Sequence, residues 1–134
     1  MVAINNISDC KRVVIKIGSS LVTGNSNDID KKFLDSISSD IQNLHKQNKE
    51  VILVSSGAVA LGNRNKDKKK LSLSESQAAS SVGQIKLING WENALKNKGI
   101  QIAQILITAE DTENRRRYLN ARATFEELLK EKYI

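Results

Sequence analysis

The sequence predicts an α/β fold built on a mainly parallel sheet. Short apolar runs, which are typical of buried strands, alternate with segments whose apolar residues recur every three or four positions, which is typical of helices. Strands joined by helical crossovers pair in parallel, and helices then cover both faces of the sheet. The 134 residues suit one domain, and no linker or internal repeat divides them.

Three apolar runs are the predicted strands, and they span residues 12–17, 50–54 and 100–107. The first run is apolar on both faces until Lys16, which favours a buried position in the sheet. Tyr133 and Ile134 are typical of the first step of a fourth strand. Three strands make a narrow sheet with an open edge, so the sequence predicts the first half of a larger α/β domain, truncated after about three strands.

Two of the three predicted helices show an apolar stripe along one face. The stripe of the first consists of Ile29, Phe33, Ile37, Ile41 and Leu44. The stripe of the last, which follows a polar turn, consists of Tyr118, Ala121, Phe125 and Leu128. Asp28 or Asn27 suits the N-terminal cap of the first helix, because a short side-chain acceptor binds the free amides there.

The middle helix begins after a basic stretch. Ser74 and Gln77 fit a capping box at its start, and Gly83 and Gly90 are candidate breaks within it. Gly99 is typical of a helix end before the third strand. Trp91 falls among the apolar positions of this helix, which favours a place in the core.

Composition and charge limit the classes of function. The net charge of +6 is concentrated in the run RNKDKKK at residues 64–70, which favours a solvated loop over a contact with a polyanion. The chain has five aromatic residues, few for stacking on bases, so a nucleic-acid partner is disfavoured. No apolar run is long enough to span a membrane, and the start of the chain lacks the apolar centre of a signal peptide. The single cysteine, Cys10, excludes an internal disulfide, so we expect a cytoplasmic protein.

Polar residues follow the first strand in the stretch KIGSS. Ligands of open parallel sheets bind beyond the carboxyl ends of the strands. The amides of Gly18, Ser19 and Ser20 are candidates for an anion-binding nest, with the charge of Lys16 beside it. A lysine inside an apolar strand is costly unless it is paired, which predicts an anionic partner. The alternative is a lysine that reaches solvent at a strand end beside an ordinary turn.

A second polar turn, SSG at residues 55–57, lies where the second strand gives way to a predicted helix. Serine hydroxyls and the free amides of a helix start suit a carboxylate or a phosphate. The alternative is that Ser55 or Ser56 only caps the helix. The P-loop pattern does not occur, which excludes that class of nucleotide site.

Three consecutive arginines, Arg115 to Arg117, are a further candidate for phosphate contact. Glu110, Asp111 and Glu113 precede them and balance their charge. We therefore predict an exposed turn whose charges pair with one another, and such pairs contribute little free energy.

Taken together, these stretches resemble the amino-terminal half of the glutamate 5-kinases, within the amino acid kinase superfamily. The matching stretches, in chain order, are VVIKIGSSLVTG, VILVSSGAVALG, QAASSVGQIKLINGWE and QILITAEDTENRRRYLNARATFEELL. They cover nearly the whole chain from Lys11 onward. The K-x-G pattern recurs across the superfamily, whereas SSGA and RRRYLNAR favour the glutamate 5-kinases. The kinase half of the bifunctional pyrroline-carboxylate synthases is a related alternative.

The resemblance implies a fold, a three-layer α/β/α sandwich, and an enzymatic reaction. The implied reaction transfers the γ-phosphate of ATP to the side-chain carboxylate of L-glutamate, the first step of proline synthesis. By resemblance, Lys16 contacts the β- and γ-phosphates, Gly18 and Ser19 supply amides to them, and Ser56 with Gly57 binds glutamate. Mg²⁺ is expected only as part of the ATP complex, with no metal held by the protein.

The resemblance also implies what residues 1–134 lack, which is the carboxyl-terminal part of the same kinase domain. We therefore expect no appreciable kinase activity from this chain alone. A homo-oligomer or a complementary carboxyl-terminal chain is the expected macromolecular partner. The alternatives are a non-catalytic remnant that binds anions or a complementary chain and, less favoured, a small basic nucleic-acid-binding protein.

Overall fold

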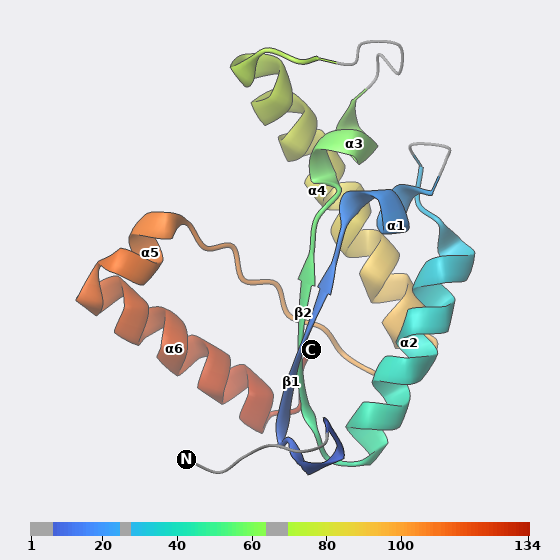
Figure 1. Ribbon diagram of the computed structural model, residues 1–134, viewed down its shortest axis with the longest axis vertical. Coiled ribbons are helices and arrows are strands. Elements are labelled where there is room, and N and C mark those ends of the chain that lie inside the picture. The colour runs from blue at the N-terminus through green and yellow to red at the C-terminus, as the bar shows by residue number, and fades with distance from the viewer. Residues whose placement is uncertain (1–6, 25–27, 64–69) are drawn as a thin grey trace.

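The computed structural model describes residues 7–24, 28–63 and 70–134. Two parallel strands, β1 (Arg12–Ile17) and β2 (Glu50–Ser55), form the sheet of this part of the chain (Figure 1). Their register places Arg12 opposite Glu50 and Ile17 opposite Ser55. This parallel pair among helices confirms the predicted α/β class.

Helices lie on both sides of the strands. They are α1 (Ser19–Thr23), α2 (Lys31–Lys46), α3 (Ala58–Gly62), α4 (Leu73–Lys96), α5 (Ala109–Glu113) and α6 (Arg115–Lys130), preceded by a 3-10 turn at Ile7–Asp9. Figure 1 shows α2 and α4 together on one side of the strands and α6 on the other. The three long predicted helices are therefore present, and α3 is the helix predicted after the second strand. The short helices α1 and α5 are additions, at the end of β1 and in the predicted polar turn.

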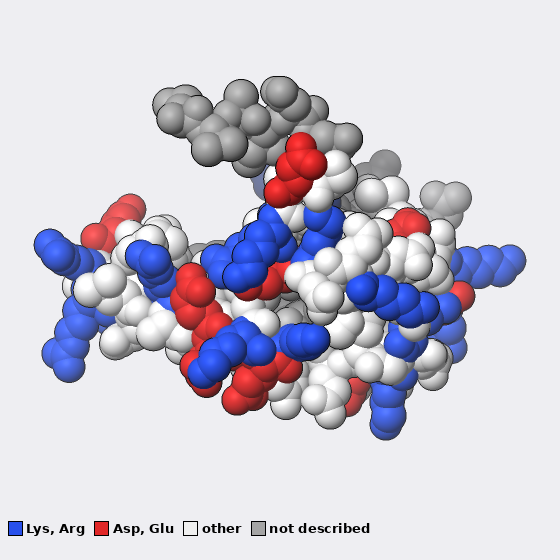
Figure 2. Space-filling model, turned by 90° about the horizontal axis from the view of Figure 1, so that it is seen from below, with Lys and Arg blue, Asp and Glu red and all other residues white. Residues whose placement is uncertain are grey.

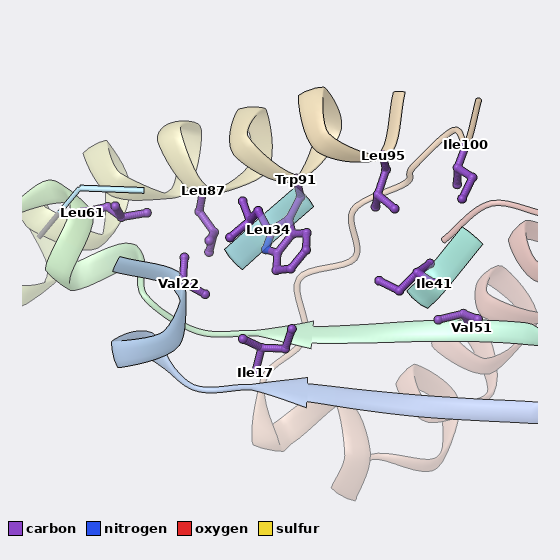
Figure 3. Close-up of a cluster of buried hydrophobic side chains, with 10 residues drawn as sticks. All are labelled: Ile17, Val22, Leu34, Ile41, Val51, Leu61, Leu87, Trp91, Leu95 and Ile100. Atoms are coloured by element: carbon purple, nitrogen blue, oxygen red, sulfur yellow. The ribbon is translucent and has the colours of Figure 1, made fainter. Parts of the chain in front are cut away.

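The core lies between the sheet and the pair α2 and α4. Ile17 and Val51 face it from the two strands, and Leu34 and Ile41 face it from α2. From α4, Leu87, Trp91 and Leu95 belong to the cluster, which also includes Val22, Leu61 and Ile100 (Figure 3). Trp91 is only 3% exposed, which confirms its predicted place in the core. Burial of these side chains is the main term that holds this side of the molecule together.

The crossing of α3 over α4 depends on glycine. A Cβ placed on Gly62 would lie 1.8 Å from the carbonyl oxygen of Ala79, and one on Gly83 would lie 1.7 Å from that of Ala58. The two backbones therefore touch directly. The prediction that Gly83 and Gly90 break the middle helix is wrong, since α4 is continuous and its glycines make room for neighbouring elements.

The N-terminal caps lie close to the predicted residues but not on them. Asp30 caps α2 and accepts a hydrogen bond from the amide of Phe33 at 3.0 Å. The predicted Asp28 is not the cap, and Asn27 lies outside the described residues. The capping box of α4 consists of Ser72 and Glu75, two residues before the predicted pair Ser74 and Gln77. The predicted end at Gly99 is confirmed, because α4 ends at Lys96 and Gly99 has a φ of +76°.

The first strand is buried on one face only. Along β1, exposed residues alternate with more buried ones, and Val14 on the open face is 60% exposed. The prediction that this strand is buried on both faces is therefore wrong for the described chain. The strand has the predicted apolar residues, but its apolar side chains pack against helices only on the side of α2 and α4.

The predicted third strand is also wrong. Residues 100–108 run without helix or strand, and the described backbone of residues 104–107 makes no backbone hydrogen bond to another segment. Tyr133 and Ile134 are not in a strand either. Ile134 nevertheless donates to the carbonyl of Gln101 at 3.2 Å and accepts from the amide of Ala103 at 2.9 Å. The apolar pattern of these segments is typical of strands. A strand forms, however, only where its backbone hydrogen-bonds to a neighbouring strand.

Candidate functional site

The two predicted turns meet at the carboxyl ends of β1 and β2. Ser56 joins them, because its amide donates to the carbonyl of Ile17 at 3.1 Å and its hydroxyl lies 3.4 Å from the same oxygen. Parallel pairing places the ends of neighbouring strands at one edge of the sheet. Residues 39 positions apart in the sequence therefore share one site.

The first turn opens α1. Gly18 precedes this helix with extended backbone, and its carbonyl accepts from the amides of Leu21 and Val22 at 3.2 and 3.3 Å. A Cβ on Gly18 would meet no described atom within 4 Å. Ser19 and Ser20 are exposed in the first helical turn, where backbone amides have no acceptor within the helix. The turn therefore presents amides and hydroxyls to open space, as an anion site requires.

The second turn depends on Gly57, whose φ is +121°. Residues with a Cβ rarely adopt this backbone conformation, so glycine is required here. A Cβ at this position would also lie 3.5 Å from Cβ of Val22 and 3.7 Å from Cα of Ser19. Gly57 is therefore where the second turn packs against α1.

A groove of about 630 Å³ opens at this edge, and we call it the strand-end groove. Three of the five predicted site residues, Ser19, Ser56 and Gly57, line it together with Ser55 and the start of α3. Lys16 and Gly18 do not line it. Figure 1 places its components, α1, α3 and the ends of both strands, at the same end of the sheet.

Sequence reasoning missed what α4 contributes to this groove. Ser76 and Gln84 line it beside Leu87, and Trp91 donates its indole N–H to the hydroxyl of Ser55 at 2.9 Å. The spacing of Ser76, Gln84 and Leu87 along one helix, at intervals of eight and three, was the available signal. Trp91 is thus both a core residue and the partner that orients Ser55.

Lys16 lies on the open face of the sheet. In the register it stands opposite Val54, and its side chain is exposed. The expectation that burial forces an anionic partner on this lysine is therefore wrong, because β1 keeps it in solvent. Among the described residues no ion pair holds it, so its ammonium group is free to reach an anion near the strand ends.

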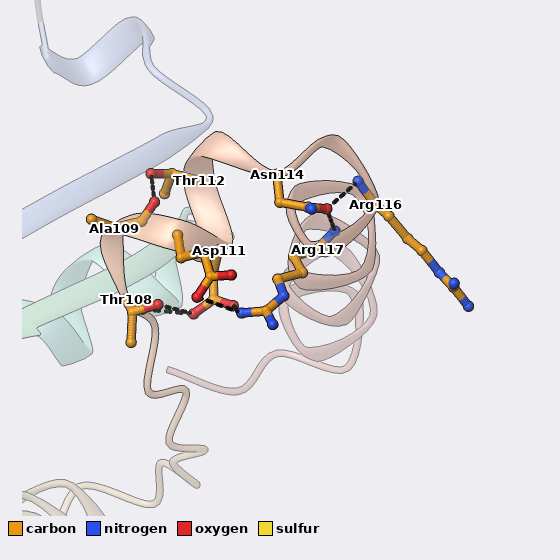
Figure 4. Close-up of polar contacts among 8 residues, drawn as sticks. Thr108, Ala109, Asp111, Thr112, Asn114, Arg116 and Arg117 are labelled. Carbon is orange, nitrogen blue, oxygen red and sulfur yellow. Dashed lines mark hydrogen bonds and ion pairs between the residues drawn. The ribbon is translucent and has the colours of Figure 1, made fainter.

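The prediction of a self-paired turn at the three arginines is confirmed only in part, because Arg115 to Arg117 begin α6 and, among the described ion pairs, only that of Arg117 joins them to the preceding acidic residues. Arg117 lies 3.1 Å from Glu110 and 3.7 Å from Asp111 (Figure 4). Hydrogen bonds from the amide and hydroxyl of Thr108 hold the pKa of Asp111 below its ordinary value, with the charge of Arg117 acting in the same direction. Asn114 caps α6 by accepting from the amides of Arg116 and Arg117. The cluster stabilises a turn, away from the strand-end groove.

The opposite end of the sheet also carries paired charges. Glu50 lies 2.9 Å from Lys11 and 2.8 Å from Arg12, and these two cations hold its pKa below its ordinary value. Arg12 also reaches Glu126 of α6 at 3.3 Å, and the hydrogen bonds that its guanidinium donates to the carboxylates of Glu126 and Glu50 raise its pKa. Figure 2 shows basic and acidic side chains interspersed on the face seen from below. Of the basic run 64–70, only Lys70 belongs to the described residues.

The described part of the chain shows neither a metal-binding cluster nor a membrane-spanning helix. The described residues contain no group of three or more His, Cys, Asp or Glu side chains placed to hold a metal ion. None of the described helices is both long and apolar enough to cross a membrane.

The chain resembles known proteins over a range that contains this site. The model of the amino acid kinase family matches residues 11–134, a range that contains both strand-end turns. The chain belongs to the amino acid kinase family. Within this family it is similar to the glutamate 5-kinase of Ruegeria sp. (strain TM1040), at 52% identity over 126 residues. It is also similar to the glutamate 5-kinases of Pelagibacter ubique (strain HTCC1062), at 49% over 126 residues, and Brucella abortus (strain S19), at 47% over 133 residues.

The coverage of these matches is unequal. The matches with the first two relatives cover 92% of this amino acid kinase chain, and the match with the third covers 98%. The same matches include only 34%, 34% and 35% of the relatives. The chain therefore spans about a third of the length of the curated relatives that it matches.

Proposed function

We propose that this chain supplies the phosphate- and glutamate-binding edge of a glutamate 5-kinase. Such an enzyme transfers the γ-phosphate of ATP to the side-chain carboxylate of L-glutamate, which is the first step of proline synthesis. The single observation that carries the proposal is the family match over residues 11–134, which includes both turns at the strand ends. The cytoplasm, where ATP and glutamate are available, is the proposed location.

The proposed chemistry needs no nucleophile from the protein. An oxygen of the substrate carboxylate attacks the γ-phosphorus, the new O–P bond forms, and the bond to the bridging oxygen of ADP breaks. Catalysis then consists of alignment and of charge stabilisation on the transferring group. ATP enters as its Mg²⁺ complex, and the ion neutralises part of the phosphate charge.

Each proposed residue has a role that its position supports. The exposed Lys16 provides a mobile cation for the β- and γ-phosphates, and the turn at Gly18 and Ser19 provides amides with open space in front of them. Ser56, held by Ile17 at the mouth of the strand-end groove, provides a hydroxyl for the substrate carboxylate. Gly57 lets the backbone come close to α1 and so brings the two turns together.

The proposed enzyme includes more than residues 1–134. Because the chain spans about a third of its relatives, we propose that activity requires the unmatched remainder, supplied in the same polypeptide or by a complementary chain. The 134-residue chain alone is then inactive. A homo-oligomer of the completed enzyme is compatible with this proposal, whereas nucleic acid and membrane have no part in it.

The test measures acyl phosphate formation with and without the remainder. The chain is expressed alone, or together with the unmatched part of the Ruegeria sp. glutamate 5-kinase, and γ-glutamyl phosphate is trapped with hydroxylamine. We expect product only from the co-expressed pair. In the co-expressed pair, Lys16→Ala should lower the rate of product formation by about 100-fold or more, because a preorganised charge at the transferring phosphate is lost. Lys32→Ala, which removes an exposed lysine of α2, is the matched control.

Two outcomes contradict the proposal. Robust product from residues 1–134 alone, with contaminating full-length enzyme excluded, contradicts the need for the unmatched remainder. Equal activity of the Lys16→Ala and Lys32→Ala pairs contradicts the role of Lys16. A pair that forms but makes no product favours the alternative, a non-catalytic chain that binds a complementary partner.

A further inference from the structure

The bond between Trp91 and Ser55 joins the core to the strand-end groove. Trp91 is 3% exposed, and its indole N–H donates to the hydroxyl of Ser55 at 2.9 Å. Figure 3 shows its ring directed from α4 toward the strands. Ser55 is the last residue of β2 and lines the strand-end groove, whereas Trp91 lies outside it. Trp91 can therefore influence the groove through Ser55 without reaching it.

Ser55 occupies a position where the strand pattern favours an apolar side chain. Alternate residues of a strand share one face, and Val51, Leu53 and Ser55 alternate along β2. Val51 belongs to the core cluster and Leu53 packs against it. A serine at the next position buries less apolar surface than a valine would. What it adds instead is an acceptor for the indole N–H.

The same bond directs the proton of the Ser55 hydroxyl. An indole N–H can only donate, so the Ser55 oxygen accepts from it and keeps its own proton for another acceptor. That acceptor is the carbonyl of Ser56, at 3.3 Å. The amide of Ser56 donates to the carbonyl of Ile17 at 3.1 Å. Both backbone polar groups of Ser56 are therefore bonded, one to β1 and the other to Ser55.

The segment after β2 is held by α4 at its far end as well. The ammonium group of Lys86 donates to the carbonyl of Leu61, near the end of α3, at 3.0 Å. The residues from Ser56 to Ala60, between these two bonds, line the strand-end groove. Helix α4 therefore holds this wall of the groove at both ends, and the bond from Trp91 is the one beside Ser56.

We propose that Trp91 and Ser55 form a positioning pair for the substrate carboxylate. Trp91 fixes the hydroxyl of Ser55, Ser55 fixes the peptide of Ser56, and Ser56 presents its hydroxyl to the side-chain carboxylate of L-glutamate. A buried polar network whose members are all bonded specifies one arrangement, and a small misalignment of a reacting group is costly. The role of Ser56 is that of the proposed function, and in this respect the inference rests on it.

The first experiment detects the bond without any activity. Trp91 is the single tryptophan of the chain, so its indole N–H gives one resonance in a proton–nitrogen correlation spectrum. Ser55→Ala should move this resonance upfield and speed its hydrogen exchange by about tenfold or more, because the N–H loses its acceptor. Ser55→Thr keeps a hydroxyl and should leave both unchanged. Ser81→Ala is the matched control, because the hydroxyl of Ser81 bonds within α4, to the carbonyl of Gln77.

The second experiment measures the affinity for L-glutamate. It uses residues 1–134 joined to the unmatched remainder of the Ruegeria sp. glutamate 5-kinase. Calorimetry gives the Kd for glutamate, and hydroxylamine trapping gives kcat and both KM values. Ser55→Ala and Trp91→Phe should each raise the Kd and KM for glutamate by about fivefold, because the peptide of Ser56 is no longer held. The KM for ATP, whose proposed contacts lie on the first turn, should change by less than about twofold.

A double variant separates the bond from the packing of the ring. Ser55→Ala and Trp91→Phe remove the same bond, so together they should raise the Kd for glutamate no further than the worse of the two alone. Ser55→Thr and Ser81→Ala should bind glutamate like the unmodified polypeptide. Weaker binding by Trp91→Phe alone, with Ser55→Ala unchanged, would assign the effect to core packing and overturn the positioning pair.

The remaining outcomes separate this inference from the proposed function. An indole resonance that does not respond to Ser55→Ala shows that the bond is absent and overturns the inference. If Ser55→Ala and Ser81→Ala bind glutamate equally well, the positioning role is wrong while the kinase proposal stands. If glutamate binding follows the expected variant pattern but no γ-glutamyl phosphate forms, the positioning pair stands and the kinase proposal fails. A completed polypeptide that binds no glutamate contradicts both.

Discussion

The two faces of the sheet differ in how far they are covered. On the side of α2 and α4, the strands bury Ile17 and Val51 in a continuous core with Leu34, Trp91 and Leu95 (Figure 3). On the other side, α6 meets β1 through the ion pair of Arg12 with Glu126, and apolar side chains such as Val14 and Val54 remain in solvent. The same kind of apolar strand residue is therefore buried on one face and exposed on the other.

An apolar pattern in a strand therefore does not by itself determine whether its side chains are buried. The covered face holds its structure through burial within this chain. The open face has the apolar pattern of a core without its partner. Mutations on the covered face should therefore act on stability, whereas mutations on the open face should act on association.

The largest expected effect is that of Trp91→Ala. Removal of this nearly buried side chain leaves a cavity beside the sheet, and we expect a loss of about 3–5 kcal/mol in the free energy of unfolding. Val54→Ala, on the open face, should change it by no more than about 0.5 kcal/mol. Urea unfolding followed by circular dichroism measures both. Similar losses for the two variants would show that the faces do not differ in the way proposed.

The next effect concerns the crossing of α3 and α4. Gly62→Ala forces a methyl group into the backbone of α4 at Ala79, and we expect a loss of about 3 kcal/mol. Gly18→Ala is the matched control, because a methyl group there meets open space and the backbone has a negative φ. Thermal unfolding of the two variants compares them, and an unchanged Tm for Gly62→Ala would refute the close backbone contact.

The covered face shows how much of the fold the sequence contains. The apolar stripe of the first helix, the apolar run at residues 50–54 and the helix end at Gly99 are local patterns, and they appear in the structure as α2, β2 and the end of α4. The strand predicted at residues 100–107 is absent from the described structure. Its apolar pattern is correct for a buried strand, but pairing is a relation to another segment, which local sequence does not specify.

The strand-end site shows a similar division. The turns after the two strands were predictable, because glycine and serine directly follow apolar runs at what must be one edge of a parallel sheet. The contribution of α4 was not, because Ser76 and Gln84 follow helical spacing that also fits an ordinary solvated face. The bond from Trp91 to Ser55 joins a core residue to a turn residue 36 positions away, and only the packing of α4 on the sheet brings them together.

A smaller effect is expected at the start of α2, which supplies part of the covered face. Asp30→Ala removes the acceptor for the amide of Phe33, and we expect a loss of about 1 kcal/mol in the free energy of unfolding. Asp28→Ala is the matched control, because within the described part of the chain its carboxylate bonds only to the adjacent amide of Ile29. Equal losses from the two variants would show that the helix is capped at the residue predicted from the sequence.

The smallest expected effect is the dependence of stability on pH at the far end of the sheet. Lys11 and Arg12 hold the pKa of Glu50 below its unfolded value of about 4.3, so the stabilisation is fully present above that pH. It is lost as the pH falls through the lower pKa of the folded state, because protonation removes the charge that both cations bind. Urea midpoints between about pH 3 and pH 7 measure this, and Glu50→Gln should flatten the acid side of the curve. Glu92→Gln, at an exposed position on α4, should leave that side steep, and an equally flat curve for both variants would assign the acid sensitivity to other carboxylates.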